Sequence, residues 1–502
     1  MNILLVESNG IKVEDVNSGE NVGPIRLFHP KGNLLAITSH LQHVLPEAKV
    51  RTLDMKDGED TKSFKTIKYG DRKLQISFLG KTLRPLEEEV KDTDFLFVTS
   101  NFTCETNSVL RVLDHAKKTN SRLRTFIGGS DVMARPDFYK DYVDGVFVGE
   151  IESLSEEELR SFLFNSKGII YAKDNVNMNS LKPDFIGLDI SRFKESDEGP
   201  LPKWVRSPFL SLETSRGCKR ACNFCTTAYL KGRYRYMNLE TINKFLDFYK
   251  QRGVKSILMI EDNLLSRVQA QTEAEREEGV IEVLAIIDLL KKKGFVWEWA
   301  NGLEIGLLWN PFKNEVDVRL TEALYSHYGS DEMMVGCVRG YTPLEKLYQN
   351  FMNKFKKLVS FDKEKEILKV IASTNVPLIH CGVIIGTPDE TEDSIKITEE
   401  RATEVKELFE SSGQTQTYIN VFASIPLPGT PDYNNFSKKG ALRYSITDSP
   451  ELWTFTTSVI QGRVFSPENM TRIRVELSDR INGPEAAKYW RKSGKYFTDS
   501  MH

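Results

Sequence analysis

The stretch Glu213-Thr-Ser-Arg-Gly-Cys218-Lys-Arg-Ala-Cys222-Asn-Phe-Cys225 is a CxxxCxxC motif, and it follows an apolar run, Phe209 to Thr214, that is typical of a β-strand. The residues between the cysteines are largely polar, which disfavours a buried apolar position for the thiols. Three thiolates bind three irons of a cubane iron–sulfur cluster and leave the fourth iron open to another ligand. Zinc is the alternative, but a closed zinc site needs four ligands, and no histidine lies near this stretch. The motif therefore predicts a [4Fe–4S] cluster held by Cys218, Cys222 and Cys225.

The composition is that of a globular protein with several domains. The 502 residues include 68 Lys and Arg against 71 Asp and Glu, which gives a net charge of −3, and 40% are hydrophobic. This length predicts about two to four domains. The near-neutral balance excludes a broad basic surface for nucleic acid. No run approaches the ~18 apolar residues of a membrane-spanning helix, and Met1 to Val6 leads into Glu7 without signal-peptide features. We therefore expect a cytoplasmic protein with no nucleic-acid or membrane partner.

The N-terminal part alternates between strand and helix patterns. Strands are predicted at 3–6, 50–53, 95–99, 124–127 and 143–148, and helices at 34–45 and 108–118. This rhythm is typical of a doubly wound parallel sheet. The charged stretch 60–90 is interpreted as an insertion that can form a hairpin. Gly128-Gly129 and Gly149-Glu150 follow predicted strands directly, at the carboxyl ends where such sheets bind ligands.

A proline-rich linker at 174–208 separates this part from a second α/β series. Strands are predicted at 209–214, 256–260, 296–300, 333–335, 378–385 and 418–423, with helices between them, for example at 280–292 and 395–408. Six such units predict a partial or full parallel barrel whose site lies at the strand carboxyl ends. A tail follows, with a helix near 467–481. The predicted boundaries are 1–165 for the first domain, 166–207 for the linker, 208–436 for the barrel and 437–502 for the tail.

The cysteine motif and its flanks resemble one enzyme family. Phe224 stands at the aromatic position of the family's CxxxCxΦC loop, and Glu213–Gly217 and Lys231–Tyr236 resemble the flanking segments of radical SAM enzymes that carry an N-terminal cobalamin-binding domain. The resemblance covers about residues 1 to 435 in order. It implies an α/β chain with a Rossmann-like cobalamin-binding domain, a partial (β/α)6 radical SAM barrel and a C-terminal mostly helical extension. It also implies three cofactors, namely a [4Fe–4S] cluster, S-adenosylmethionine and cobalamin.

The same resemblance assigns S-adenosylmethionine contacts. Glu261-Asp262-Asn263 corresponds to groups at the amino end of the methionine, and Gly382–Pro388 matches the GxIxGxP segment that packs along the adenine. Met334–Gly340 is taken as the end of the fourth strand, where relatives read Gly-x-Glu-Ser-Gly. Val338 occupies the Glu position, so Arg339 or Glu304 is the candidate for the ribose contact. The predicted set is Phe224, Glu261, Asp262, Asn263, Glu304, Arg339, Ile384 and Gly386.

Cobalamin contacts are implied at the strand ends of the first domain. The predicted set is Thr99, Ser100, Phe102, Thr103, Gly128, Gly129, Gly149 and Glu150. The DxHxxG pattern that supplies a lower cobalt ligand in some cobalamin proteins is absent, since Asp114 and His115 are adjacent. Two interpretations stay open: a cobalamin bound without a histidine beneath cobalt, or a domain that keeps the fold and has lost the cofactor.

The implied function is that of a cobalamin-dependent radical SAM methyltransferase. Such an enzyme cleaves S-adenosylmethionine at the cluster to a 5′-deoxyadenosyl radical and transfers methyl from methylcobalamin to an unactivated carbon, or to phosphorus. We expect a small-molecule or peptide substrate and an electron donor such as flavodoxin or ferredoxin. One alternative is a non-methylating radical reaction, namely ring contraction, epimerisation or cross-linking. Another is a non-catalytic iron–sulfur or zinc protein.

Two placements stay open from the sequence. The run Trp297-Glu298-Trp299 alternates, so either the glutamate or both indoles face the inside of the barrel. The aromatic tail from about Gly440 either covers the barrel mouth as a lid or packs as a helix on the outer face. Cys104, Cys337 and Cys381 lie in apolar segments and are predicted to be buried small hydrophobic residues.

Overall fold

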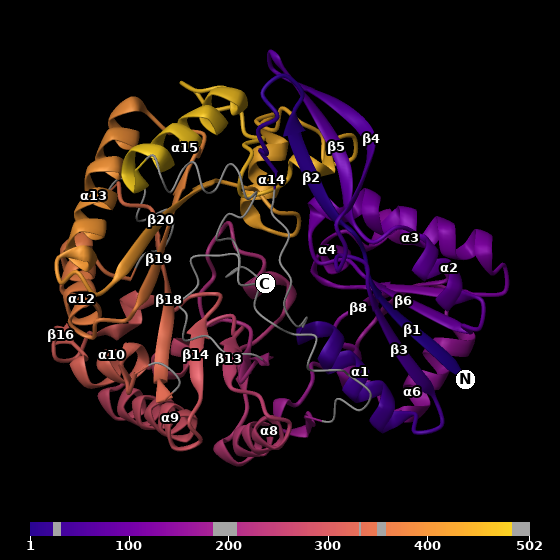
Figure 1. Cartoon of the computed structure of the whole chain (residues 1–502), viewed down its shortest axis with the longest axis horizontal. Helices are drawn as coiled ribbons and strands as arrows, with labels where there is room; N and C mark the ends of the chain where they lie inside the picture. Colours follow the sequence, from indigo (N-terminus) through magenta and orange to yellow (C-terminus); the bar gives the residue numbers. More distant parts are fainter. Residues whose placement is uncertain (24–31, 184–207, 331–332, 349–357, 484–502) are drawn as a thin grey trace.

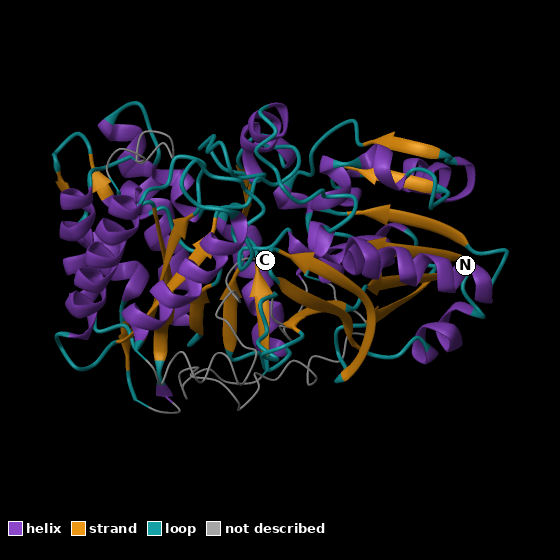
Figure 2. Ribbon diagram, turned by 90° about the horizontal axis from the view of Figure 1, so that it is seen from above, coloured by secondary structure: helices purple, strands orange, loops and turns teal. Residues whose placement is uncertain are grey.

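The computed structural model describes residues 1–23, 32–183, 208–330, 333–348 and 358–483. Two α/β bodies lie side by side, an N-terminal sheet with its helices and a curved sheet surrounded by helices (Figures 1 and 2). The predicted linker lies largely outside the described residues. Within them, no helix is long and apolar enough to cross a membrane.

The N-terminal body is a six-stranded parallel sheet in the order β3-β1-β6-β7-β8-β9. Its strands are β1 (Asn2–Glu7), β3 (Lys49–Asp54), β6 (Phe95–Thr99), β7 (Arg124–Gly128), β8 (Gly145–Val148) and β9 (Gly168–Tyr171). Its helices are α1 (Gly32–Val44), α2 (Arg84–Val90), α3 (Thr106–Thr119), α4 (Ser130–Ala134), α5 (Pro136–Tyr139) and α6 (Glu156–Asn165). Apolar cores on both faces confirm the doubly wound arrangement. The sheet continues past residue 165, where the sequence predicts the end of the first domain, because β9 pairs with β8.

The predicted insertion forms part of a small antiparallel sheet. Strands β4 (Asp60–Tyr69) and β5 (Arg72–Gly80) make a hairpin, and β2 (Gly10–Asp15) pairs with β5 on its other side. Strand β2 was not predicted from the sequence, because its partner lies some 60 residues away along the chain. The apolar face of this sheet packs against residues between 425 and 460, so it joins the first domain to the chain that follows the barrel.

The second body is a partial barrel of six parallel strands in chain order. The strands are β10 (Phe209–Leu212), β13 (Ser256–Met259), β14 (Val296–Trp299), β18 (Val335–Glu345), β19 (Leu378–Ile385) and β20 (Gln416–Ala423). The outer helices are α8 (Leu239–Gln251), α9 (Glu273–Lys292), α10 (Val318–Tyr325), α12 (Phe361–Ser373), α13 (Glu392–Glu410) and α15 (Pro467–Asn482). These helices surround the strands (Figure 1) and share one large apolar core with them.

The fourth barrel strand differs from the prediction. A strand was expected at 333–335, with Met334–Gly340 at its end, but β18 has 11 residues and ends at Glu345. The segment Gly336–Gly340 therefore lies in its first half. A register shift opposite Trp297 and Glu298 and another near Pro343 show two irregular places, which break the periodicity from which a strand is recognised.

The C-terminal extension has two parts. Helix α15 packs on the outer side of β20, and Met470, Leu477 and Ile481 are buried in the barrel core. It therefore matches the outer-helix alternative. Before it, Leu452 and Trp453 bury their side chains against the small antiparallel sheet. Short elements complete this end of the molecule and the loops near the cysteines: α7 (Thr227–Leu230), α14 (Pro431–Lys438), β11 (Ser215–Arg216) and β12 (Arg235–Tyr236).

Candidate functional site

The three cysteines lie on one loop whose base is a short strand pair. Strands β11 and β12 pair antiparallel, with Arg216 opposite Arg235, and residues 217–234 form the loop between them. Gly217 has a φ of +81°, and a Cβ there would lie 2.9 Å from the carbonyl oxygen of Arg233, so this position requires glycine. The cysteine loop, residues 217–234, thus leaves the barrel immediately after β10 and returns to the same place.

Polar hydrogens surround Cys218. The backbone N–H of Arg220 donates to its Sγ at 3.4 Å, the Asn263 Nδ2 at 3.5 Å and the Ser266 hydroxyl at 3.9 Å. Hydrogen bonds of this kind stabilise a thiolate and are one of the factors that set the potential of an iron–sulfur cluster. The environment of Cys218 therefore suits a thiolate ligand.

Burial has the largest effect on the pKa of the other two thiols. It raises the pKa of the Cys222 thiol to about 12, with Glu345 adding to the effect, and it also raises the pKa of Cys225. Both thiols thus favour the protonated form until a metal takes the place of the proton. Within the described ranges, no three His, Cys, Asp or Glu side chains are arranged to hold one metal ion. Three cysteines on one loop nevertheless fit a cubane cluster, whose ligands are spread over separate irons.

Residues that follow β13 stabilise the cysteine loop through hydrogen bonds. Glu261 is buried and accepts hydrogen bonds from the hydroxyls of Thr214 and Ser215, and burial raises the pKa of its carboxyl group. Asp262 accepts from the Gly217 N–H and the Lys231 Nζ, both at 2.8 Å. The structure therefore brings these two predicted residues to the cysteine loop but gives their carboxylates partners within the protein.

Asn263 differs from its neighbours. Its Nδ2 points to Cys218, while its Oδ1 is buried and has no hydrogen-bond partner among the described residues. A buried acceptor without a donor costs about 1 to 3 kcal/mol. This oxygen fits a ligand that brings a donor, such as an ammonium group, beside the cysteine loop.

Inside the barrel, Glu298 of β14 forms a buried ion pair with Arg339 of β18. Trp297 and Trp299 lie in the outer core, and the Trp299 indole N–H donates to the Leu324 carbonyl oxygen at 2.9 Å. This arrangement resolves the alternation, because the glutamate faces inward. The expectation that Arg339 lies at the end of its strand is wrong.

Glu304 lies near the cysteine loop, and Gly382 of β19 lies against Tyr341. Glu304 contributes to the raised pKa of Cys222, and its carboxylate accepts the Gly306 N–H at 3.3 Å. A Cβ on Gly382 would lie 2.0 Å from the Tyr341 hydroxyl oxygen, so glycine is needed to accommodate this phenol. Tyr341 is a neighbour of the predicted adenine segment that was not predicted from the sequence. In the sequence, only the position of Tyr341 in β18 could have indicated this contact, and that strand was not recognised at its full length.

Glu390 stabilises the turn after β19. Gly386 has a φ of +88°, and its N–H donates to the Glu390 Oε2 at 2.9 Å. Glu390 forms a buried ion pair with Lys346 and accepts the Ser394 hydroxyl at 2.6 Å. Val383 and Ile385 pack in the outer core, which leaves Gly382 and Ile384 on the opposite face of the strand.

Three of the residues predicted to contact cobalamin use their hydroxyls within the first domain. Thr99 donates to Glu7 at 2.5 Å, Thr103 donates to Asp131 at 2.6 Å, and the Ser100 hydroxyl lies 3.1 Å from that of Tyr139. The Phe102 ring lies 5.8 Å from the Lys56 Nζ. These contacts stabilise the carboxyl ends of β1 and β6, where the strand order reverses.

The two glycines after β7 differ. Gly129 has a φ of +118°, and a Cβ there would lie 2.5 Å from the Ser100 carbonyl oxygen, so the fold itself requires glycine. A Cβ on Gly128 would meet nothing nearer than the Phe147 carbonyl oxygen at 3.7 Å. This is an ordinary contact distance, so the fold itself does not require glycine at position 128.

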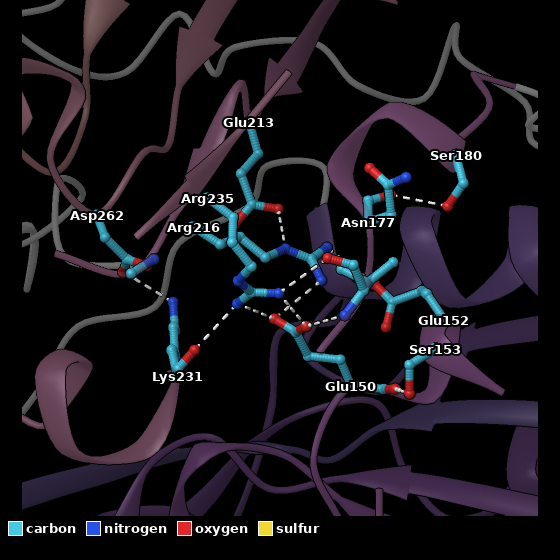
Figure 3. A network of polar contacts seen from close by, with 12 residues as sticks. Glu150, Glu152, Ser153, Asn177, Ser180, Glu213, Arg216, Lys231, Arg235 and Asp262 are labelled. Carbon is cyan, nitrogen blue, oxygen red and sulfur yellow. Dashed lines mark hydrogen bonds and ion pairs between the residues drawn. The ribbon is translucent and has the colours of Figure 1, made fainter. Parts of the chain in front are cut away.

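Other residues of the protein occupy the space around Gly149 and around the carboxylate of Glu150. A Cβ on Gly149 would lie 2.4 Å from that of Ala172. Glu150 binds Arg235 through both carboxylate oxygens, at 2.6 and 2.9 Å, and lies 3.5 Å from Arg216 (Figure 3). The end of β8 is therefore joined directly to the base of the cysteine loop.

No model of a known protein family matches the sequence. The chain is 24% identical over 339 residues to the ribosomal protein uS12 methylthiotransferase RimO of Chlamydia felis, which is 65% of this chain and 64% of that protein. The structure of OxsB, a cobalamin-dependent S-adenosylmethionine radical enzyme with aqua-cobalamin and S-adenosylmethionine bound, matches with a TM-score of 0.64 at 13% identity, over 94% of this chain and 65% of OxsB. The chain thus spans less than two thirds of both proteins.

The radical S-adenosylmethionine methyltransferase TsrM of Kitasatospora setae, with cobalamin and a [4Fe–4S] cluster bound, matches with a TM-score of 0.58 at 12% identity, over 96% of this chain and 91% of TsrM. The chain has the fold of the cobalamin-dependent radical SAM enzymes. The resemblance inferred from the cysteine motif is therefore confirmed, and so is the fold class. In this radical SAM fold, the cysteine loop follows the first barrel strand and contacts the N-terminal sheet.

Proposed function

We propose that the chain is a cobalamin-dependent radical SAM methyltransferase that methylates an unactivated carbon, or phosphorus, of a small molecule or peptide. Cys218, Cys222 and Cys225 would hold a [4Fe–4S] cluster, and the barrel interior would bind S-adenosylmethionine. Cobalamin would lie at the carboxyl edge of the N-terminal sheet. When bound, the cluster supplies the electron that cleaves S-adenosylmethionine, and cobalamin supplies a methyl group that can be transferred.

One observation carries this proposal: the cysteine loop is bound to the carboxyl edge of the N-terminal sheet. Glu150, which follows β8, binds the arginines at both ends of the loop. On the other side, helix α7 of the loop contacts α4, which follows β7. Open α/β sheets and parallel barrels both bind ligands at the carboxyl ends of their strands. The two ligand-binding edges therefore meet at the cysteine loop, as a reaction that uses two cofactors together requires.

The described residues have plain roles in this reaction. The side-chain Oδ1 of Asn263 would accept a hydrogen bond from the ammonium group of S-adenosylmethionine. Gly382 and Ile384 would present strand backbone to the adenine beside Tyr341, and Gly128 would let a corrin or its tail approach the backbone. The hydrogen bonds that Glu261 and Asp262 accept would keep the cysteine loop in place. The barrel walls would exclude water from a radical intermediate. An external electron donor such as flavodoxin or ferredoxin would reduce the cluster.

A second candidate is methylthio transfer, because the curated relative RimO is a methylthiotransferase. The sequence match covers 64% of RimO, whereas the structural match covers 91% of TsrM. The structures of OxsB and TsrM match over 94% and 96% of this chain, and both proteins hold cobalamin, which supports methyl transfer as the first candidate. A non-methylating radical reaction uses the same cluster and S-adenosylmethionine, and only the fate of the methyl group separates it from our proposal.

Labelled S-adenosylmethionine tests the proposal. Anaerobically reconstituted protein, hydroxocobalamin, a reductant and S-adenosylmethionine with a CD3 group would be incubated with small-molecule and peptide fractions of a cell extract. Methyl transfer predicts products that carry CD3 without added sulfur, and their absence with the Cys222→Ala variant. CD3 accompanied by sulfur would indicate methylthio transfer. Formation of 5′-deoxyadenosine with no CD3 in any product would indicate a non-methylating reaction.

A further inference from the structure

The base of the cysteine loop contains two positive charges on facing residues. Arg216 and Arg235 are direct partners in the two-residue ladder of β11 and β12. Like charges directly opposite each other on an antiparallel pair destabilise that pair. A loop closed by these arginines therefore needs an anion that binds them together.

Glu150 is that anion, and it comes from the other domain. Its carboxylate binds both terminal nitrogens of Arg235, at 2.6 and 2.9 Å, lies 3.5 Å from the Arg216 Nη1, and accepts the Val176 N–H at 2.9 Å. The Glu150 and Arg216 side chains are only 11% and 9% exposed. Although burial alone would raise the pKa of Glu150, the two arginines keep it below its ordinary value, so the group is an anion at neutral pH.

Arg216 and Lys231 have further acidic partners around the base. Arg216 binds Glu152 of the first domain and Glu213 of the barrel, both at 2.8 Å. Lys231 inside the loop binds Asp262 at 2.8 Å (Figure 3). Glu152 and Glu213 each contact Arg216 but not Arg235. Glu150 contacts both arginines. Within this network, Glu150 is therefore the carboxylate that joins the two ends of the loop.

The chain around Glu150 fixes its direction. Gly149 has a φ of +134° and packs closely on Ala172, and the Glu150 carbonyl oxygen accepts the N–H and the hydroxyl of Ser153, at 3.0 and 2.8 Å. The carboxylate thus leaves a well-determined turn at the carboxyl end of β8. Any movement of this turn relative to the barrel moves the anion that closes the cysteine loop.

We propose that Glu150 is a positioning residue for the cysteine loop: by binding Arg216 and Arg235 together, it holds the loop closed and couples its geometry to the N-terminal domain. This inference rests on the proposed function, since it assumes that the loop holds a cluster. Glu150 touches neither the thiols nor a reacting atom, so its effect is on the retention and environment of the cluster.

The test uses full-length protein and isosteric variants. Glu150→Gln removes the charge and keeps the volume, whereas Glu150→Gln with Arg235→Gln removes one charge of each sign at the loop base. Glu158→Gln is the matched control, because Glu158 pairs with Lys173 on the surface of the same domain, and glutamine at this position preserves the start of α6. Each protein is reconstituted with iron and sulfide under anaerobic conditions. The measurements are the rate of iron loss to a chelator and the EPR spectrum of the reduced cluster.

Breaking a buried charge pair is strongly destabilising, so we expect Glu150→Gln to lose iron on the order of tenfold faster than the parent protein, with a changed EPR spectrum. The double variant should recover much of this loss, and Glu158→Gln should match the parent. A merely structural role predicts additive losses in the double variant, which would overturn the inference. Iron loss from Glu150→Gln at the parent rate would also overturn it. If Glu150→Gln does not fold, the comparison is made with Arg235→Lys, which keeps the charge but loses the contact through two nitrogens to Glu150. This variant should lose iron faster than the parent, and iron loss at the parent rate would overturn the inference.

Different results would contradict the proposed function and the role of Glu150. Parent protein that assembles no cluster contradicts the proposed function itself. Parent protein that holds a stable cluster, together with variants that are indistinguishable from it, contradicts only the role of Glu150.

Discussion

Deletion of the chain from Ser449 should abolish folding rather than uncouple catalysis. The deleted part contributes seven large side chains that are at most 6% exposed: Leu452, Trp453, Val459, Ile460, Met470, Leu477 and Ile481. Four of them pack against the small antiparallel sheet and three against the outer side of the barrel. At about 1.5 to 3 kcal/mol for each buried side chain, the loss exceeds ~10 kcal/mol. This is comparable with the whole stability of a typical domain, about 5 to 15 kcal/mol.

Polar contacts add to this loss. The Tyr69 hydroxyl, at the tip of the β4–β5 hairpin, bonds to the Ser458 carbonyl oxygen at 2.7 Å and to the Thr471 hydroxyl at 2.6 Å. The Arg474 Nε donates to the Thr456 carbonyl oxygen at 2.9 Å. Deletion removes these hydrogen bonds, each of which contributes about 0.5 to 1.5 kcal/mol net.

The assay compares the deletion with two point variants of the same segment. Trp453 is 2% exposed and Val464 is 54% exposed. Trp453→Ala should cost about 3 to 5 kcal/mol and lower the melting temperature on the order of 10 °C, whereas Val464→Ala should change stability by less than about 0.5 kcal/mol. The deleted protein should be insoluble or lack a cooperative thermal transition. Soluble protein that melts cooperatively and keeps its cluster would refute this reasoning and favour a lid.

Two further pairs of substitutions test the site and the core. Gly128→Val should leave the fold intact and lower the cobalamin content of reconstituted protein, measured by corrin absorbance, whereas Gly129→Val should destabilise the protein with or without cobalamin, because its Cβ would meet the Ser100 carbonyl oxygen. Full cobalamin content in Gly128→Val would contradict the placement of the corrin at Gly128, and a parent protein without corrin absorbance would favour a domain that has lost the cofactor. Glu298→Gln breaks the buried ion pair with Arg339 and should cost about 3 kcal/mol in thermal unfolding. The exposed pair of Glu277 and Arg319 supplies the control, since Glu277→Gln should cost less than about 1 kcal/mol.

Local patterns predicted most of the architecture. The strands of a parallel sheet are buried on both faces and appear as short apolar runs, such as Phe95–Thr99, which the structure shows as β6. The cysteine loop was predictable because all three cysteines lie on one continuous stretch. In both cases the signal depends on neighbouring residues along the chain, which a sequence displays directly.

The features that were missed depend on residues far apart in the sequence. Strand β2 is defined by its pairing with β5, and the true length of β18 is hidden by two register shifts. Glu150 was assigned to cobalamin because it follows a strand, but its partners Arg216 and Arg235 lie on another domain. Tyr341 and Gly382 face each other across neighbouring strands. A single sequence contains no signal for such pairings.

Iron and sulfide counting on single cysteine variants tests the central claim most directly. The parent protein, reconstituted under anaerobic conditions, should hold about four irons and four sulfides per chain and cleave S-adenosylmethionine to 5′-deoxyadenosine. Cys218→Ala, Cys222→Ala and Cys225→Ala should each lose the cluster and this activity, whereas Cys104→Ala, which alters a buried thiol in the first domain, should keep both. Cleavage at the parent rate by any one of the first three variants would contradict the account.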